Sequence, residues 1–148
     1  MKELIEGNTG AKFSQKEVIR NSKGDIRKII PTGKAEDSTP FLECYFSNLN
    51  QFSTKKWKKD SVNTQHLSVA FGRIVVICIK EESNANIFEE FELDDNDNHG
   101  ILEIPPGIIY GIWTGMTGAV VLNTLFKLYN EADKVEVYED FSIQPKKL

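Results

Sequence analysis

The stretch Ile104-Pro105-Pro106-Gly107-Ile108-Ile109-Tyr110-Gly111-Ile112-Trp113 places a rigid turn between two apolar, strand-like runs. Each proline fixes its own φ and favours extended geometry in the residue before it. Gly107 supplies the backbone freedom that a chain reversal needs. Two interpretations stay open. The stretch is either a proline-bearing hairpin of the kind found in any β-domain, or a turn that aims Tyr110 into the mouth of a ligand-binding barrel.

The rest of the chain has the punctuation of a β-protein. Gly72 separates two apolar runs and predicts two strands joined by a tight turn, the second of them buried on both faces. Helical pieces are expected only near residues 14–19 and after Glu131. Strands at short, even spacing are typical of a sandwich or barrel. The predicted strands cover residues 26–30, 41–47, 66–71, 74–80, 88–93, 101–104 and 119–126.

Composition narrows the class of protein. A chain of 148 residues, 40% hydrophobic, fits one globular domain over residues 1–148. The net charge of −4 argues against a general nucleic-acid binder. No apolar run reaches membrane-spanning length and the first residues do not form a signal peptide, so we expect a cytoplasmic protein without a membrane partner. Cys44 and Cys78 are predicted to be buried, reduced thiols.

Metal and cofactor sites are not expected from the sequence. His66 and His99 are the only histidines; they lie far apart, and His99 falls in a polar loop that is expected to be exposed. A bound metal needs three or four converging ligands, which two scattered histidines do not supply. The acidic loop at residues 94–97 lacks the downstream glutamate of a calcium loop. We therefore predict no metal and no cofactor.

The segment Lys55-Lys56-Trp57-Lys58-Lys59-Asp60 concentrates positive charge around an aromatic ring. Such a patch suits a phosphate next to a base or sugar ring. Lysines on an edge strand are equally an ordinary guard against aggregation. Strict alternation along a strand puts Lys56, Lys58 and Asp60 on one face and Lys55, Trp57 and Lys59 on the other, so we expect at most half of them in one pocket.

Four segments together resemble the cupin-fold sugar-nucleotide epimerases, the dTDP-4-dehydrorhamnose 3,5-epimerase superfamily. Residues 41–47 resemble the early strand of that family, and Trp57 with residues 64–67 and 72–74 resembles its central hairpin. Residues 104–111 resemble its proline-rich turn, and Leu128-Tyr129-Asn130 resembles the segment after its last barrel strand. The resemblance covers residues 24–139 and implies an all-β, cupin-type jelly-roll barrel with minor helical segments. Residues 1–22 match nothing in the family and are expected to be an arm over a partner subunit or a frayed terminus.

The resemblance also implies a homodimer that holds a nucleotide-sugar, dTDP-linked in this family, for polysaccharide precursor biosynthesis. Family chemistry removes a proton beside the 4-keto group of the sugar and returns it to the other face of the carbon. Tyr129 stands where the family has its acid tyrosine. The usual histidine base is replaced by Lys58 or Asp60, and a later histidine by Tyr110. Lys55 stands where the family has a phosphate-binding arginine.

The candidate catalytic residues are therefore Tyr129, Lys58 and Asp60. The candidate substrate-binding residues are Lys55, His66, Tyr110 and Asn123. His66 is expected to face the barrel, and Asn123 interrupts an apolar strand, where a buried amide must find partners. Three functions stay open: an epimerase or ketoisomerase acting on a dTDP-4-keto-6-deoxyhexose, a non-catalytic cupin that binds a nucleotide-sugar or another ligand, and a structural or unrelated small-ligand cupin.

Overall fold

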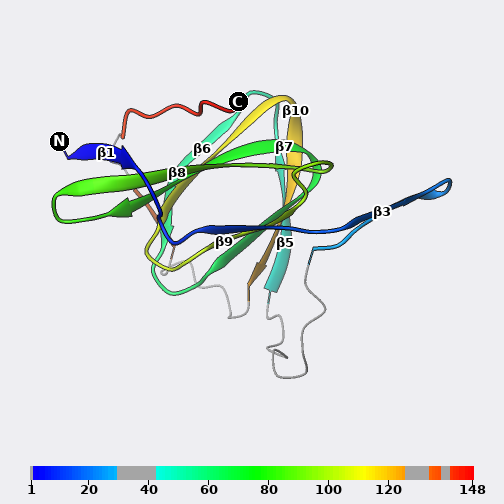
Figure 1. The fold of residues 1–148 in the computed structure, drawn as a ribbon, viewed down its shortest axis with the longest axis horizontal. Helices are drawn as coiled ribbons and strands as arrows, with labels where there is room; N and C mark the ends of the chain where they lie inside the picture. Colours follow the sequence, from blue (N-terminus) through cyan, green and yellow to red (C-terminus); the bar gives the residue numbers. More distant parts are fainter. Residues whose placement is uncertain (1, 30–42, 126–133, 138–140) are drawn as a thin grey trace.

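The computed structural model describes residues 2–29, 43–125, 134–137 and 141–148. Every regular element among these residues is a β-strand, as the all-β prediction requires (Figure 1). The strands are β1 (Glu3–Glu6), β2 (Lys12–Gln15), β3 (Val18–Asn21), β4 (Gly24–Arg27), β5 (Glu43–Leu49), β6 (Thr54–Asp60), β7 (Gln65–Glu81), β8 (Ala85–Asp94), β9 (Gly100–Ile104), β10 (Ile109–Leu125) and β11 (Lys134–Glu136). In these described ranges there is no helix long and apolar enough to cross a membrane.

Two 17-residue strands, β7 and β10, run antiparallel and organise two layers. The first half of β7 and the second half of β10 lie in one layer, in the order β2-β9-β7-β10-β5. The second half of β7 and the first half of β10 lie in the other, in the order β1-β8-β7-β10-β6-β11. Each long strand therefore belongs to both layers, which makes the pair the frame of the barrel.

Both long strands change layer where Gly72 of β7 meets Gly118 of β10. Both glycines have positive φ, 87° and 65°, a conformation that other residues adopt at a cost. A Cβ atom on Gly72 would collide with the carbonyl oxygen of Gly118, and one on Gly118 would lie 2.6 Å from the carbonyl oxygen of Leu49. The register between the strands shifts here because β10 has extra residues between Thr114 and Ala119.

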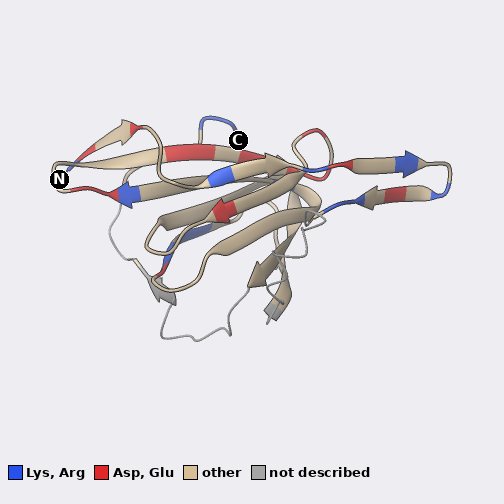
Figure 2. Ribbon diagram, turned by 60° about the horizontal axis from the view of Figure 1, so that its bottom comes forward, with Lys and Arg blue, Asp and Glu red and all other residues tan. Residues whose placement is uncertain are grey.

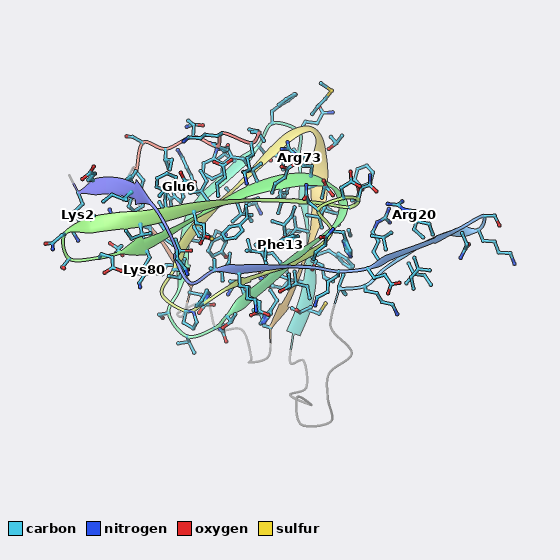
Figure 3. All side chains as sticks on the ribbon, viewed as in Figure 1. Lys2, Glu6, Phe13, Arg20, Arg73 and Lys80 are labelled. Carbon is cyan, nitrogen blue, oxygen red and sulfur yellow. The ribbon has the colours of Figure 1, made fainter. Side chains whose placement is uncertain are left out.

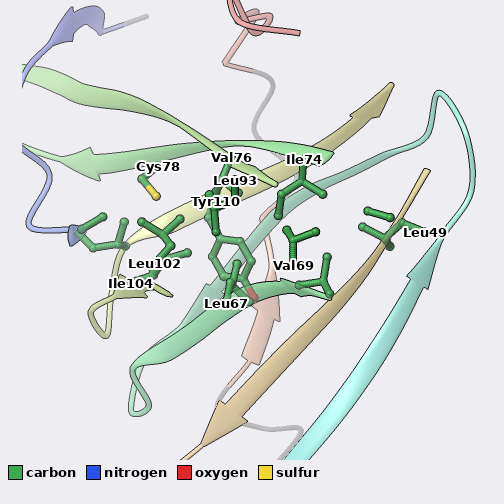
Figure 4. Close-up of a cluster of buried hydrophobic side chains, with 14 residues drawn as sticks. Leu49, Leu67, Val69, Ile74, Val76, Cys78, Leu93, Leu102, Ile104 and Tyr110 are labelled. Atoms are coloured by element: carbon green, nitrogen blue, oxygen red, sulfur yellow. The ribbon is translucent and has the colours of Figure 1, made fainter. Parts of the chain in front are cut away.

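The core lies between the two layers. Leu67, Val69 and Leu102 of one layer face Ile74 and Val76 of the other (Figure 4). A second apolar cluster, Trp57, Ile77, Ile79, Ile109, Trp113 and Phe141, covers the outer face of the layer that contains β6 and β8. Residues 74–79 are fully buried, which confirms that this part of the chain is buried on both faces.

The hairpin of β3 and β4 projects away from the two layers (Figure 1) and carries charges of both signs (Figure 2). Before it, β1 pairs in parallel with β8, and β2 pairs with β9. Phe13 of β2 packs against the core, whereas Arg20 lies out on the hairpin (Figure 3). The division into an arm at 1–22 and a barrel at 24–139 stays a prediction, although β1 and β2 both join the main sheet.

Several predictions about local structure are wrong. Residues 12–15 and 18–21 form strands where a helix was expected near 14–19, and Lys134–Glu136 is a strand where a helix was expected after Glu131. Gly72 bends one continuous strand instead of joining two. The proline turn at 104–109 is no hairpin, because β9 and β10 do not pair with each other; it carries the chain from one layer to the other. Gly107 has the positive φ, 84°, that the turn predicts.

The two cysteines also differ from the prediction that both are buried. Cys78 is buried in the core, but Cys44 on β5 is exposed. Burial raises the pKa of the Cys78 thiol well above its usual range, and the carboxylate of Glu89 on the neighbouring strand adds to the effect. Cys78 is therefore an inert packing residue, since only the thiolate is reactive.

Gly72→Ala tests the crossing of the two long strands. We expect it to lower the free energy of unfolding by about 2 kcal/mol or more, because the new methyl group meets backbone atoms at a positive φ. Gly115→Ala in β10 is the matched control, since the nearest atom to its Cβ lies at 3.9 Å, and it should change stability by less than about 0.5 kcal/mol. Urea unfolding followed by tryptophan fluorescence measures both. Equal effects of the two substitutions would contradict this account.

Candidate functional site

A cavity of about 350 Å³ opens between the inner faces of the two layers. One layer contributes residues of β5, β7 and the second half of β10; the other contributes residues of β6 and the first half of β10. Its apolar wall is Leu49, Leu67, Ile112 and Val121, and its polar wall is Tyr45, Ser47, Lys55, Lys58, Tyr110 and Asn123. The cavity continues the core cluster of Figure 4, where Tyr110 and Leu67 lie side by side.

Lys55 and Lys58 both line this cavity, contrary to the prediction from strict alternation. The reason is an irregularity in the pairing of β6 with β10. Tyr110 is paired with Lys58, and Ile112 is paired with Lys55, so two residues of β6 lie opposite the single residue Gly111. A bulge of this kind adds one residue to one strand and reverses which face the following side chains take. It brings the two ammonium groups to the same side of the strand.

The outer face of the bulge is held by aromatic packing. Trp57 is 3% exposed and contacts the rings of Trp113 and Phe141 edge-on, with centroids 5.4 and 5.3 Å apart. Gly111 makes room for this packing, because a Cβ atom there would lie 3.0 Å from the Trp57 ring. Trp57 is thus a packing residue on the outside of β6, while Lys55 and Lys58 face the cavity.

The cavity is a positively charged environment. Among the described residues that line it, two are lysines and none is a carboxylate or a histidine. No described acidic side chain forms an ion pair with Lys55 or Lys58, and this includes Asp60 on the same strand. Two cations without such a counter-ion, next to hydroxyl and amide groups, favour an anionic ligand that also carries hydrogen-bonding groups.

Four of the seven residues singled out in the sequence come together here: Lys55, Lys58, Tyr110 and Asn123. Tyr110 is 4% exposed and Asn123 is 3% exposed, so both present polar atoms from otherwise buried positions. Tyr129 lies outside the described residues, and its role stays a prediction.

Asp60 and His66 are not among the residues that line the cavity. Asp60 is buried at the end of β6, where its carboxylate accepts hydrogen bonds from the backbone N–H groups of Val62 (2.9 Å) and Asn63 (2.7 Å). Its backbone carbonyl accepts a hydrogen bond of 2.7 Å from the N–H of Gly107, which ties β6 to the proline turn. His66 alternates with Leu67, which lines the cavity, so its side chain lies on the other face of β7.

The histidines do not form a metal site with other described residues: no group of three or more histidine, cysteine or acidic side chains converges in this part of the chain. A ring nitrogen of His66, Nδ1, lies 3.1 Å from the carbonyl oxygen of Thr124. His99 is 1% exposed, contrary to the expectation of an exposed loop residue, and its Nε2 lies 2.6 Å from the carbonyl oxygen of Lys28. That contact holds the base of the β3–β4 hairpin. The expectation of no metal stays a prediction.

Two polar residues of the cavity were missed in the sequence, Tyr45 and Ser47. The sequence does indicate that the two side chains share a face, since they stand two positions apart on a predicted strand. Which face is turned inward depends on the pairing of β5 with β10, where Tyr45 is opposite Asn123 and Ser47 is opposite Val121. That pairing is not visible in the sequence.

Several solved structures similar to this one are enzymes named for dTDP-sugars or their epimerisation and isomerisation. A dTDP-sugar isomerase from Desulfovibrio desulfuricans G20 is 27% identical, with a TM-score of 0.78 over 90% of this chain and 87% of that one. A dTDP-6-deoxy-D-glucose 3,5-epimerase from Legionella pneumophila, in complex with dTDP-4-keto-L-rhamnose, is 12% identical, with a TM-score of 0.70 over 86% and 72%. A sugar 3,4-ketoisomerase from Thermoanaerobacterium thermosaccharolyticum, in complex with TDP, is 18% identical, with a TM-score of 0.67 over 86% and 88%.

These likenesses confirm the predicted fold class, an all-β jelly-roll of the cupin type. They also confirm the resemblance: the structural neighbours are dTDP-sugar isomerases and dTDP-4-dehydrorhamnose 3,5-epimerases. The sequence itself matches no family model and no curated protein. The fold thus defines the class of protein that this chain resembles, and the cavity supplies the residues from which a function is argued.

Proposed function

We propose that this chain binds a dTDP-4-keto-6-deoxyhexose in the cavity between its two layers and acts on it as an epimerase or ketoisomerase. The observation that carries the proposal is the pair Lys55 and Lys58, turned into one cavity by the bulge in β6. The fold is shared with enzymes that act on dTDP-sugars, and the D. desulfuricans protein covers 90% of the chain.

The lining of the cavity suits the parts of such a ligand. A diphosphate carries negative charge that Lys55 is placed to neutralise. Sugar hydroxyl and keto groups need donors and acceptors, which Tyr45 and Tyr110 present. The apolar wall covers the flat faces of the ligand and excludes water.

The proposed reaction moves one proton. A base removes hydrogen from the carbon beside the 4-keto group, the electron pair forms an enolate, and a donor returns a proton to a carbon of that system. Lys58 is the only one of the two candidate bases that reaches the cavity, and it is paired across the sheet with Tyr110. As a base it reacts as the neutral amine, and the ammonium that it becomes on taking up the proton stabilises the enolate oxygen. Tyr129 remains the proposed acid.

A second candidate function is binding without catalysis. It is favoured by the described lining of the cavity, which contains neither histidine nor carboxylate, the usual general bases. The same nucleotide-sugar, or another small anionic ligand, would then be held without turnover. Under both functions we place the protein in the cytoplasm, in the preparation of polysaccharide precursors, and as a homodimer.

Binding of dTDP tests the lysine pair. We expect Lys55→Ala to weaken dTDP binding about tenfold or more, because it removes a charge-assisted contact to phosphate, and Lys58→Ala to weaken it less, because Lys58 faces the sugar. Lys56→Ala is the matched control, since this neighbouring lysine is exposed and does not line the cavity. Isothermal titration calorimetry measures all four proteins. The proposal is wrong if the wild type binds no nucleotide, or if Lys56→Ala weakens binding as much as Lys55→Ala does.

Deuterium exchange separates the two candidate functions. An epimerase or ketoisomerase exchanges the hydrogen on the carbon beside the 4-keto group with solvent. When dTDP-4-keto-6-deoxyglucose is incubated with the protein in heavy water, the proton NMR signal of that hydrogen should therefore disappear. Lys58→Ala should slow this loss by about 100-fold or more. Binding without any exchange would rule out the enzyme and leave the binding protein.

The homodimer is testable through the edge strand β5, which among the described strands pairs only with β10. Its Phe46 is 66% exposed, an unusual position for a large apolar side chain beside an open sheet edge. Light scattering should give twice the mass of one chain, and Phe46→Glu should shift the protein toward monomer. Ile5→Glu on β1, 43% exposed, is the control and should not. A monomeric wild type would contradict the prediction.

A further inference from the structure

A continuous line of buried polar side chains runs from the end of β6 to the cavity wall. Asp60, Gln65 and Asn123 are 2%, 1% and 3% exposed. The Nε2 of Gln65 donates to Oδ2 of Asp60 at 2.9 Å, and the Nδ2 of Asn123 donates to Oε1 of Gln65 at 2.7 Å. The same Nδ2 donates to the hydroxyl oxygen of Tyr45 at 2.8 Å. The line therefore joins a buried carboxylate to a phenol in the cavity.

The carboxylate of Asp60 sets the direction of every bond in this line. A carboxylate only accepts hydrogen bonds, so the end of Gln65 that faces it must be the NH₂ group. The other end of Gln65 is then its carbonyl oxygen, which accepts from the NH₂ group of Asn123. No described cation pairs with Asp60, and each partner of its carboxylate among the described residues is an N–H donor.

The far side of Asn123 gives the same orientation independently. Its Oδ1 accepts a hydrogen bond of 3.1 Å from the backbone N–H of His66, and a backbone N–H can only donate. If Asn123 were turned over, its NH₂ group would face the N–H of His66. The amide of Asn123 is thus held in one orientation from both ends, and its two hydrogens go to Gln65 and Tyr45.

This orientation decides how the Tyr45 hydroxyl is used. Its oxygen receives a hydrogen from Asn123, so its own hydrogen must be donated to an acceptor other than Asn123. A hydroxyl that accepts one hydrogen bond becomes a better donor of the next. Since Tyr45 lines the cavity, an oxygen of a bound ligand is an acceptor of the required kind.

We propose that Asp60 is a positioning residue of the cavity, which acts through Gln65 and Asn123 to make the Tyr45 hydroxyl a hydrogen-bond donor to the ligand. The inference rests on the proposed function for the identity of the ligand, but not for the orientation of Tyr45. It gives Asp60 a role different from that of a base, at a position that does not reach the cavity.

Tyrosine NMR reads the hydroxyl directly, without ligand or activity. The chain has four tyrosines, so protein labelled with carbon-13 at the ring carbon that bears the hydroxyl gives a simple spectrum, and Tyr45→Phe assigns the Tyr45 signal. We expect Asp60→Asn to shift this signal. The oxygen of the new amide stays on the N–H groups of the turn, so its NH₂ group faces Gln65, turns Gln65 over, and sets two NH₂ groups against each other at Asn123.

Asp94→Asn is the matched control for loss of a turn carboxylate. Asp94 accepts hydrogen bonds of 2.8 Å from the backbone N–H groups of both Asn96 and Asn98, much as Asp60 does with its own turn. Unlike Asp60, it has no hydrogen bond among the described residues that leads to the cavity. We expect Asp94→Asn to lower the melting temperature and to leave the Tyr45 signal in place.

The double variant Asp60→Asn/Gln65→Glu tests whether the donor-to-acceptor direction of these hydrogen bonds controls the Tyr45 hydroxyl. The carboxylate moves to position 65, where it accepts from the NH₂ group of the new amide at position 60 on one side and from Asn123 on the other. The original polarity at Asn123 therefore returns. We expect the Tyr45 signal to return to its wild-type position. Affinity for dTDP-4-keto-6-deoxyglucose should fall about tenfold in Asp60→Asn and in Tyr45→Phe, and recover in the double variant.

The proposal is overturned if Asp60→Asn leaves the Tyr45 signal unchanged, or if the folded double variant fails to restore it. Should Asp60→Asn not fold, Gln65→Met keeps the turn at Asp60 and cuts the line; an unshifted Tyr45 signal in this variant also overturns the proposal. A wild type that binds no dTDP-sugar refutes the proposed function alone, because the NMR result on Tyr45 is independent of ligand.

Discussion

The close approach of Gly72 and Gly118 is the constraint on which the rest of this structure depends. Where the two glycines meet, β7 and β10 leave one layer and enter the other, so a single pair of long strands holds both layers in register. No side chain fits between the two backbones, and both residues have positive φ. A Cβ atom on Gly72 would force β7 away from β10, and one on Gly118 would force β10 away from the end of β5, so either would disturb the inner faces that form the core and the cavity.

The cavity depends on a second departure from regular pairing. In a regular strand Lys55 and Lys58 would face opposite sides, and one of the two charges would be lost to solvent. The bulge opposite Gly111 turns both inward, and burial of Trp57 against Trp113 and Phe141 on the outer face stabilises that arrangement. Apolar packing outside the barrel thereby determines the charge inside it. The buried line from Asp60 to Asn123 shows the same dependence, since polar groups outside the cavity orient the groups within it.

Much of the fold could be predicted because its signals are local. Alternation and turn residues located β5, β8 and β9 and the turn at Gly107, and the apolar run at residues 74–80 indicated a strand buried on both faces. Gly72 was misjudged because a glycine between two strands marks a turn or a bend equally well, and only its partner Gly118 decides. The helix expected near residues 14–19 failed because pairing of β2 with β9, and of β3 with β4, outweighs local propensity.

By itself the sequence determined the class of fold, the order of the strands along the chain and the lysine, tyrosine and asparagine side chains that a candidate site could use. Only the tertiary structure decided which of these residues meet. It places Lys55 and Lys58 in the same cavity, with Tyr45 and Ser47 beside them in the lining, and it places Asp60 and His66 outside that lining. The physical reason is that residue type and turn chemistry can be judged from residues adjacent in the sequence. The face of the sheet toward which a side chain points depends instead on the register of strand pairing. One extra residue in a strand reverses every side chain beyond it, and that residue is set by partners distant in sequence.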